Sequence, residues 1–118
     1  MRTPARGDVW YADFSPVRGH EQAGYRPALV ISANLFNAGP AGLVVVLPMT
    51  TVDRGIPLHV AVGPPEGGVR ERSLIKCEDI RSIDQRRLTR YLGAVSQDTI
   101  AMVDDRLRAL LGLQGGAR

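Results

Sequence analysis

The hydrophobic period of the chain changes once, close to residue 96, and this change limits the folds open to it. Before that point the apolar residues come in short runs bounded by glycine, proline and polar residues, a pattern typical of β-strands. After it, one helical face carries Ile100, Val103, Leu107, Leu110 and Leu111. Ser96 and Asp98 suit the start of this helix, and Gly112 suits its end. We therefore expect a mainly β fold with helices (α+β), in which a small, strongly bent sheet or barrel packs against a C-terminal amphipathic helix.

The expected strands follow from the short apolar runs and the turns between them. They cover residues 8–14, 27–32, 43–49, 57–62, 73–83 (one strand or a bent pair) and 90–96. The 43–49 run is nearly all apolar, which predicts a central strand buried on both faces. Pro48 indicates that this strand ends or bulges there, so Thr50 and Thr51 would lie at the rim of the sheet. Residues 34–42 suit a short helical turn or loop.

Size and composition predict one folded domain over residues 1–118. Hydrophobic residues make up 44% of the 118 positions and charged residues 23%, which is usual for a globular protein. The formal net charge is +3, and Lys76 is the single basic residue that is not arginine. One cysteine, Cys77, allows no internal disulfide, and no apolar stretch reaches the roughly 20 residues of a membrane span. We therefore expect a cytoplasmic protein, with Cys77 as a buried strand thiol and no membrane partner.

Polar chemistry is concentrated between the first two expected strands, in the stretch GHEQAGYRP at residues 19–27. The whole connection, residues 15–26, is long for a small domain, and such loops are usually functional or mobile. Arg26 precedes a proline, which favours extended geometry at the mouth of a strand. The loop is thus the first candidate for a functional site.

The available side chains suit chemistry without a metal or cofactor. Two histidines and one cysteine lack the usual spacing of zinc ligands, and neither a phosphate-binding G-x-x-x-x-G-K-[ST] loop nor a G-x-S-x-G elbow is present. RNA cleavage needs neither, because the ribose 2′-OH can attack the adjacent phosphate if protein groups accept its proton and stabilise the phosphoryl charge. This composition is compatible with a ribonuclease.

The order of these motifs resembles the MazF/PemK/Kid family of toxin ribonucleases from type II toxin–antitoxin pairs. The matching segments are RGDVWYADFSP, GHEQAGYRPALVIS, VVVLPMTT, RGIP and LIKCEDIRSID, spread over residues 6–113. The G-x-E-Q-x-G-x-R-P loop is the most specific of them. The resemblance implies a homodimer of small SH3-like barrels that cuts single-stranded RNA at short sequences without a cofactor, leaving 2′,3′-cyclic phosphate and 5′-hydroxyl ends. It also implies a cognate antitoxin with an acidic, flexible tail.

Three catalytic residues follow from the resemblance. Arg26 matches the family's catalytic arginine and Thr50 its catalytic threonine, while His20 matches one branch of the family. A guanidinium remains protonated near neutrality, so we expect Arg26 to stabilise phosphoryl charge rather than to carry a proton. Thr50 suits a hydrogen bond to phosphate, and a histidine such as His20 suits proton transfer.

Other polar residues are candidates for binding RNA. Lys76 and Glu78 occupy positions where some family members carry arginine and aspartate around a cysteine. The remaining RNA-binding candidates are Glu21, Gln22, Tyr25, Thr51, Arg54 and Arg81. His59 alternates within an apolar strand and is expected to be structural.

Two other functions fit the same architecture. A CcdB-like toxin has this architecture but binds DNA gyrase, and it lacks the G-x-E-Q-x-G-x-R-P loop. A non-catalytic RNA-binding barrel or a decayed toxin is the second alternative, and intact Arg26 and Thr50 argue against decay.

Overall fold

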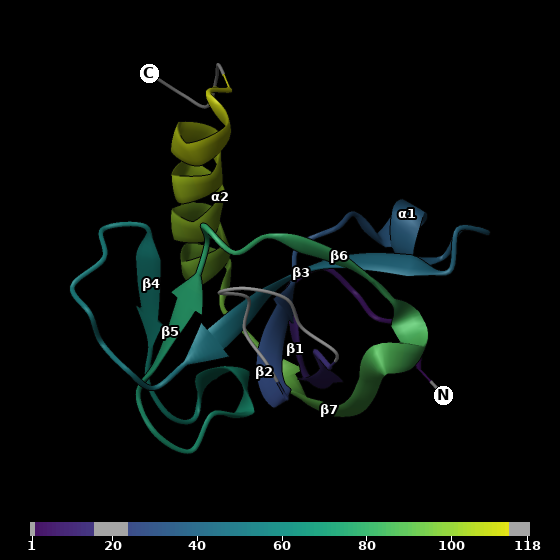
Figure 1. The fold of residues 1–118 in the computed structure, drawn as a ribbon, viewed down its shortest axis with the longest axis horizontal. Coiled ribbons are helices and arrows are strands. Elements are labelled where there is room, and N and C mark those ends of the chain that lie inside the picture. The colour runs from purple at the N-terminus through teal and green to yellow at the C-terminus, as the bar shows by residue number, and fades with distance from the viewer. Residues whose placement is uncertain (1, 16–23, 114–118) are drawn as a thin grey trace.

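The computed structural model describes residues 2–15 and 24–113. Its described strands form one strongly bent antiparallel sheet in the order β4-β5-β3-β2-β1-β7, and β6 pairs with β3 outside this path. The strands are β1 (Asp8–Asp13), β2 (Tyr25–Val30), β3 (Leu43–Thr50), β4 (His59–Val62), β5 (Ser73–Lys76), β6 (Arg81–Asp84) and β7 (Leu88–Ala94). β4 and β7 are the two ends, so the sheet is not closed (Figure 1). A bent sheet with a C-terminal helix confirms the predicted fold class.

In the described part of the chain, two α-helices and two short 3₁₀ turns accompany the strands. α1 (Asn34–Asn37) is the predicted helical turn, and α2 (Gln97–Leu111) is the predicted C-terminal helix. The 3₁₀ turns are η1 (Glu66–Gly68) and η2 (Gln85–Arg87). Ser96 caps α2 by accepting a hydrogen bond from the Thr99 amide at 3.2 Å, and Gly112 ends it with φ +67°.

β3 holds the sheet together because its two edges pair with three strands. Val44 and Val45 pair with β6, whereas Met49 and Thr50 pair with β5 on the same edge. Pro48, which has no amide hydrogen, lies between these two partners, and the strand continues past it to Thr50. The prediction that this strand ends or bulges at Pro48 was therefore wrong: the strand continues to Thr50 and changes its partner at Pro48.

Both faces of the sheet are covered by apolar side chains, as predicted for the 43–49 run. On one face Leu47 and Met49 pack with Val103 and Leu107 of α2. On the other face Val44 and Val46 pack with Trp10 and its neighbours. β3 is thus buried on both faces and ends at Thr50.

Several predicted boundaries were wrong by about two residues. β2 begins at Tyr25, not at residue 27, because Tyr25 pairs with Asp13 of β1. β4 begins at His59, because the His59 amide turns back to the Ile56 carbonyl after Pro57. β7 covers 88–94 rather than 90–96. The 73–83 region is a bent pair, β5 and β6.

Two predictions about single side chains changed with the fold. Leu110 and Leu111 lie in the last turn of α2, which projects beyond the sheet in Figure 1, and both are exposed rather than buried. Cys77 is fully buried as predicted, but it lies in the turn after β5 and not in a strand. Burial raises the pKa of the Cys77 thiol to about 11, so the group stays neutral near pH 7.

No helix in the described part of the chain has the length and apolar character needed to cross a membrane.

Candidate active site

Arg26 and Thr50 come from neighbouring strands and meet at the same end of the sheet. β2 and β3 are antiparallel, with Ala28 opposite Pro48. Continuing this register by two residues sets Arg26 opposite Thr50. Both residues line one cavity of about 230 Å³, which we call the Arg26–Thr50 cavity. The 3.1 Å hydrogen bond from the Val52 amide to Thr50 Oγ1 uses an acceptor position and leaves the hydroxyl hydrogen able to donate.

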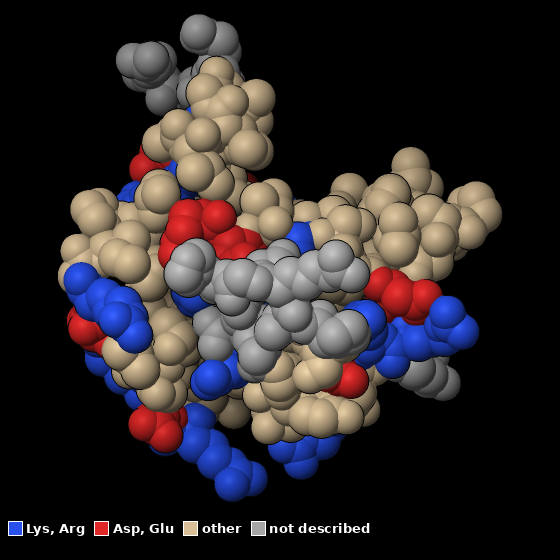
Figure 2. Space-filling view, viewed as in Figure 1, with Lys and Arg blue, Asp and Glu red and all other residues tan. Residues whose placement is uncertain are grey.

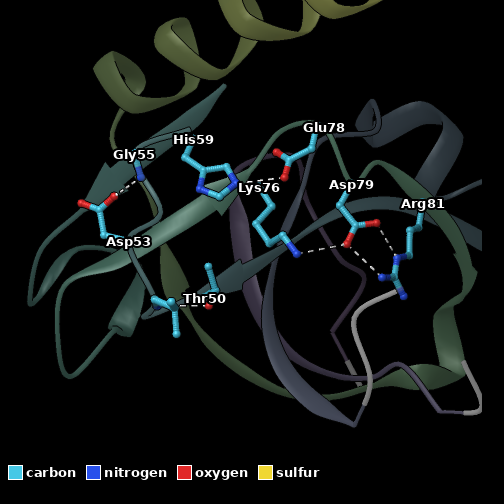
Figure 3. A network of polar contacts seen from close by, with 9 residues as sticks. Thr50, Asp53, Gly55, His59, Lys76, Glu78, Asp79 and Arg81 are labelled. Carbon is cyan, nitrogen blue, oxygen red and sulfur yellow. Dashed lines mark hydrogen bonds and ion pairs between the residues drawn. The ribbon is translucent and has the colours of Figure 1, made fainter. Parts of the chain in front are cut away.

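The far wall of the cavity comes from β4, β5 and the turn after β5. His59 lies opposite Lys76 in the β4–β5 pairing, and Glu78 follows two residues later. His59 Nε2 lies 2.9 Å from Glu78 Oε2 (Figure 3). The His59 side chain is only 3% exposed, whereas that of Glu78 is 30% exposed and borders the cavity. Of the two side chains, that of Glu78 is therefore the more exposed at the cavity, although its Oε1 atom is buried.

Two buried atoms of this pair have no hydrogen-bond partner among the described residues, namely His59 Nδ1 and Glu78 Oε1. A doubly protonated imidazole would bury an unsatisfied N–H at Nδ1, which is costly. The contact between Nε2 of His59 and Oε2 of Glu78 satisfies one polar atom of each side chain. The pair is thus built to hold a carboxylate in a fixed orientation at the cavity wall.

Cations surround this carboxylate. Lys76 lines the cavity, and its Nζ also lies 3.7 Å from Asp79 Oδ2. Arg54, on the connection between β3 and β4, also lines the cavity. With Arg26, three positive side chains face a space that also holds a hydroxyl and a carboxylate. That combination suits a bound phosphate next to a proton acceptor.

A second cavity of about 200 Å³ shares Arg26 and Thr50 with the first, and we call it the tyrosine cavity. Its lining includes Tyr11, Tyr25 and Thr51. The two tyrosine rings are stacked, with centroids 5.7 Å apart and planes inclined by 20°. Tyr25 is 55% exposed, so its ring is available to a planar ligand.

The structure therefore brings most of the predicted site residues into two adjoining cavities. The first holds Arg26, Thr50, Arg54, Lys76 and Glu78, and the second adds Tyr25 and Thr51. Arg81 lies elsewhere: its guanidinium bonds to Asp79 at 2.9 and 3.0 Å and packs 4.9 Å from the ring centroid of Phe14. His20, Glu21 and Gln22 lie outside the described residues.

His59 is the residue that sequence reasoning underestimated. Its alternation within residues 57–62 indicated a structural strand residue, and its burial agrees with that. Its bond to Glu78 joins two positions 19 residues apart, and this contact depends on the β4–β5 register. Within residues 2–15 and 24–113, no cluster of three or more His, Cys, Asp or Glu side chains could hold a metal ion.

Comparison with known proteins agrees with this architecture. The chain is 37% identical over 109 residues to endoribonuclease EndoA of Bacillus subtilis, covering 92% of this chain and 94% of EndoA. Its fold matches a crystal structure of MazF from Deinococcus radiodurans with a TM-score of 0.86 and 34% identity, over 96% of this chain and 100% of that one. A MazE–MazF structure from the same organism matches with a TM-score of 0.81 and 34% identity, over 97% and 100% of the two chains.

A family model described as PemK-like, MazF-like toxin of type II toxin-antitoxin system matches residues 5–111. Because this match spans nearly the whole chain and the relatives align over nearly their full lengths, the protein belongs to the PemK-like, MazF-like toxin family.

Proposed function

We propose that this protein is a toxin endoribonuclease that cuts single-stranded RNA at short specific sequences without a metal or cofactor. The observation that carries this proposal is the Arg26–Thr50 cavity, which combines phosphate-binding cations with the His59–Glu78 pair. The relatives named as endoribonucleases support the same activity. A match to PemK-like and MazF-like toxins favours RNA cleavage over gyrase binding.

The reaction proceeds by attack of a ribose 2′-oxygen on the neighbouring phosphorus. A bond forms between the 2′-oxygen and phosphorus, and the bond from phosphorus to the 5′-oxygen breaks. The products are a 2′,3′-cyclic phosphate and a free 5′-hydroxyl. Arg26 stabilises the added negative charge on the non-bridging oxygens, and the Thr50 hydroxyl donates a hydrogen bond to one of them.

Two proton transfers accompany this exchange. The 2′-hydroxyl must lose a proton, and the leaving 5′-oxygen must gain one. Glu78, oriented by His59, is the general base in this proposal because it borders the cavity as a carboxylate. His20 is the general acid, as its match to one branch of the family suggests. Each group then performs one transfer.

The partners follow from the family. In the MazE–MazF structure a related toxin is seen with MazE, and another related structure shows an endoribonuclease in complex with its cognate antitoxin. We infer that this toxin also has a cognate antitoxin, whose acidic, flexible tail competes with RNA for the cationic cavity. The active form is a homodimer in the cytoplasm, where its RNA substrate is found.

The direct test is cleavage of RNA by the purified protein in the presence of EDTA. We expect cuts at a short sequence, 5′-hydroxyl and cyclic phosphate ends, and complete resistance when the nucleotide 5′ of the cut carries a 2′-deoxyribose. Activity that requires added metal, or cleavage of the deoxy-substituted site, would contradict the proposed chemistry.

A further inference from the structure

A third cavity, of about 390 Å³, continues from the tyrosine cavity away from Arg26 and Thr50. We call it the arginine groove; its lining includes Tyr11, Thr51, Arg70, Ser73, Arg90 and Leu92. Tyr11, Thr51 and Ser73 line both this groove and the tyrosine cavity. The tyrosine cavity in turn shares Arg26 and Thr50 with the cavity proposed to hold the reacting phosphate. The three spaces thus adjoin one another in a row.

The groove is lined by two guanidinium groups from different parts of the fold. Arg70 belongs to the connection between η1 and β5, and Arg90 belongs to β7. Both are exposed, and neither forms an ion pair with any residue in 2–15 or 24–113. Glu71 contributes the one carboxylate of the lining. The groove therefore carries more positive than negative charge.

Each of the five arginines with a described ion pair, Arg81 included, lies beside an aspartate. Arg6, Arg72, Arg86 and Arg106 each lie within 3.0 Å of an aspartate oxygen. Figure 2 shows this mixture on one face of the molecule, where red side chains stand between the blue ones. The distribution of charge on that face therefore does not by itself indicate where RNA would bind. Arg70 and Arg90 have no ion pair among the described residues and share one groove beside the stacked tyrosines.

Aromatic rings link this charge to the reaction site. The Arg90 guanidinium lies 5.8 Å from the Tyr11 ring centroid, and Tyr11 stacks on Tyr25. Aromatic rings next to arginines are typical of surfaces that bind single-stranded nucleic acid, because bases stack on the rings while phosphates contact the cations. An acidic peptide would use the arginines but gain little from the stacked rings. The chemistry favours RNA.

We propose that the arginine groove is an extended RNA-binding subsite, in which Arg70 and Arg90 hold phosphates on one side of the cut and Tyr25 stacks a base. This inference rests on the proposed function, because it assigns the groove to the same strand that is cleaved. It predicts that substrate length, and not only the cut sequence, determines affinity.

The test compares oligonucleotides that differ only in length. The cut sequence is first found by sequencing the 5′ ends of fragments from a digested RNA pool. A short RNA centred on that sequence, and versions extended by three nucleotides at the 5′ or the 3′ end, are made uncleavable by one 2′-deoxyribose. Binding to wild-type protein and to Arg70→Ala/Arg90→Ala is measured over a range of salt concentrations. Arg108→Ala, which removes an arginine from the last turn of α2, is the matched control.

We expect one of the two extensions to strengthen wild-type binding by at least about tenfold at low salt. The double variant should lose that gain and lower the slope of log affinity against log salt by about 1.4, at roughly 0.7 per phosphate contact on a single strand. It should cleave the all-ribose form of the short RNA as fast as wild type does, and Arg108→Ala should retain the whole gain in binding.

The inference is overturned if neither extension strengthens wild-type binding, or if the double variant keeps the gain. A double variant that loses only antitoxin affinity also overturns it, because the groove would then serve the protein partner. Slower cleavage of the short RNA by the double variant would place the arginines in the reaction site instead. A wild-type protein that cuts no RNA at all would refute the proposed function itself, which is a separate outcome.

Discussion

Nε2 of His59 lies 2.9 Å from Oε2 of Glu78, and this contact fixes a carboxylate at the wall of the cavity that holds Arg26 and Thr50. The histidine is almost completely buried, whereas the Glu78 side chain is 30% exposed. His59 is therefore a positioning residue, and Glu78 is the group that would meet the 2′-hydroxyl. This division of roles predicts different effects for changes at the two positions.

The pH dependence of cleavage should distinguish Glu78 from His20. A general base must be deprotonated, so Glu78 gives a rate that rises with pH on the acidic side. A general acid must be protonated, so His20 gives a rate that falls on the alkaline side. We expect Glu78→Gln to abolish the rising limb and His20→Gln the falling limb, with each slowing kcat/KM by roughly 10²–10⁴-fold. Single-turnover cleavage rates from about pH 4.5 to 9 measure both.

A change at His59 provides the control for positioning. His59→Gln leaves the carboxylate in place but removes its fixed partner, so we expect slower cleavage with the rising limb still present. A His59→Gln protein that cuts at the wild-type rate would show that the pair has only a structural role. An alkaline limb that survives His20→Gln would remove His20 as the general acid.

Arg26→Ala and Thr50→Ala should each slow cleavage by roughly 10²–10⁴-fold, or about 3–5 kcal/mol of barrier. The reason is that each donates to charge that is largest in the transition state. Both side chains lie at the end of the sheet rather than in its core, so unfolding by urea should be little changed. Arg108→Ala is the control for loss of positive charge. Full activity in a folded Arg26→Ala protein would refute this assignment.

The order of the elements could be predicted from sequence because each depends on local information. The change of period near residue 96 indicated α2, and the capping pattern at Ser96 and Gly112 gave its ends. The strand ends were less predictable, since Tyr25 belongs to β2 only through its pairing with Asp13. Pairing between strands determines such boundaries, and this pairing cannot be predicted from a single sequence.

In the site, too, local motifs could be recognised from sequence, whereas contacts between distant strands could not. Arg26 and Thr50 were identified by family motifs, whereas their position opposite each other depends on the β2–β3 register. His59 and Glu78 come together only because β4 and β5 pair with His59 opposite Lys76. The arginine groove likewise joins a loop residue, Arg70, to a residue of β7. Contacts between distant strands therefore account for what sequence reasoning missed.

Stability should depend on pH through Glu66, which ties η1 to the start of α2. Its Oε2 accepts hydrogen bonds from Thr99 Oγ1 at 2.5 Å and from the Ser96 amide at 2.8 Å. These bonds hold the pKa of Glu66 below its usual value, the Thr99 bond most of all. A lowered pKa in the folded state means that stability is present above the usual value near 4.5 and is lost as the pH falls through the folded value.

Glu66→Gln tests this linkage. At pH 6 the variant should lose about 1 kcal/mol of unfolding free energy. This loss is small for hydrogen bonds to a charged group, because the carboxylate is partly solvated. The difference from wild type should shrink as the pH falls from the usual value near 4.5 through the lowered pKa of the folded state. Urea unfolding at pH 6 and pH 3.5 measures it, with Glu71→Gln as the same change at an exposed position. A difference that stays constant with pH would contradict the role of Glu66.

Gly68 should be among the positions least tolerant of a side chain. Its φ of +72° is unfavourable for other residues, and an added Cβ would lie 2.1 Å from the Leu92 carbonyl oxygen of β7. Gly68→Ala must therefore move η1 away from β7, and we expect it to lower the unfolding free energy by at least about 3 kcal/mol. Gly63→Ala is the matched control, because its Cβ would meet nothing within 4 Å. Its effect in urea unfolding should stay within about 0.5 kcal/mol. Equal stability of the two variants would show that η1 does not pack closely on β7, and the adjoining wall of the arginine groove would then need to be redrawn.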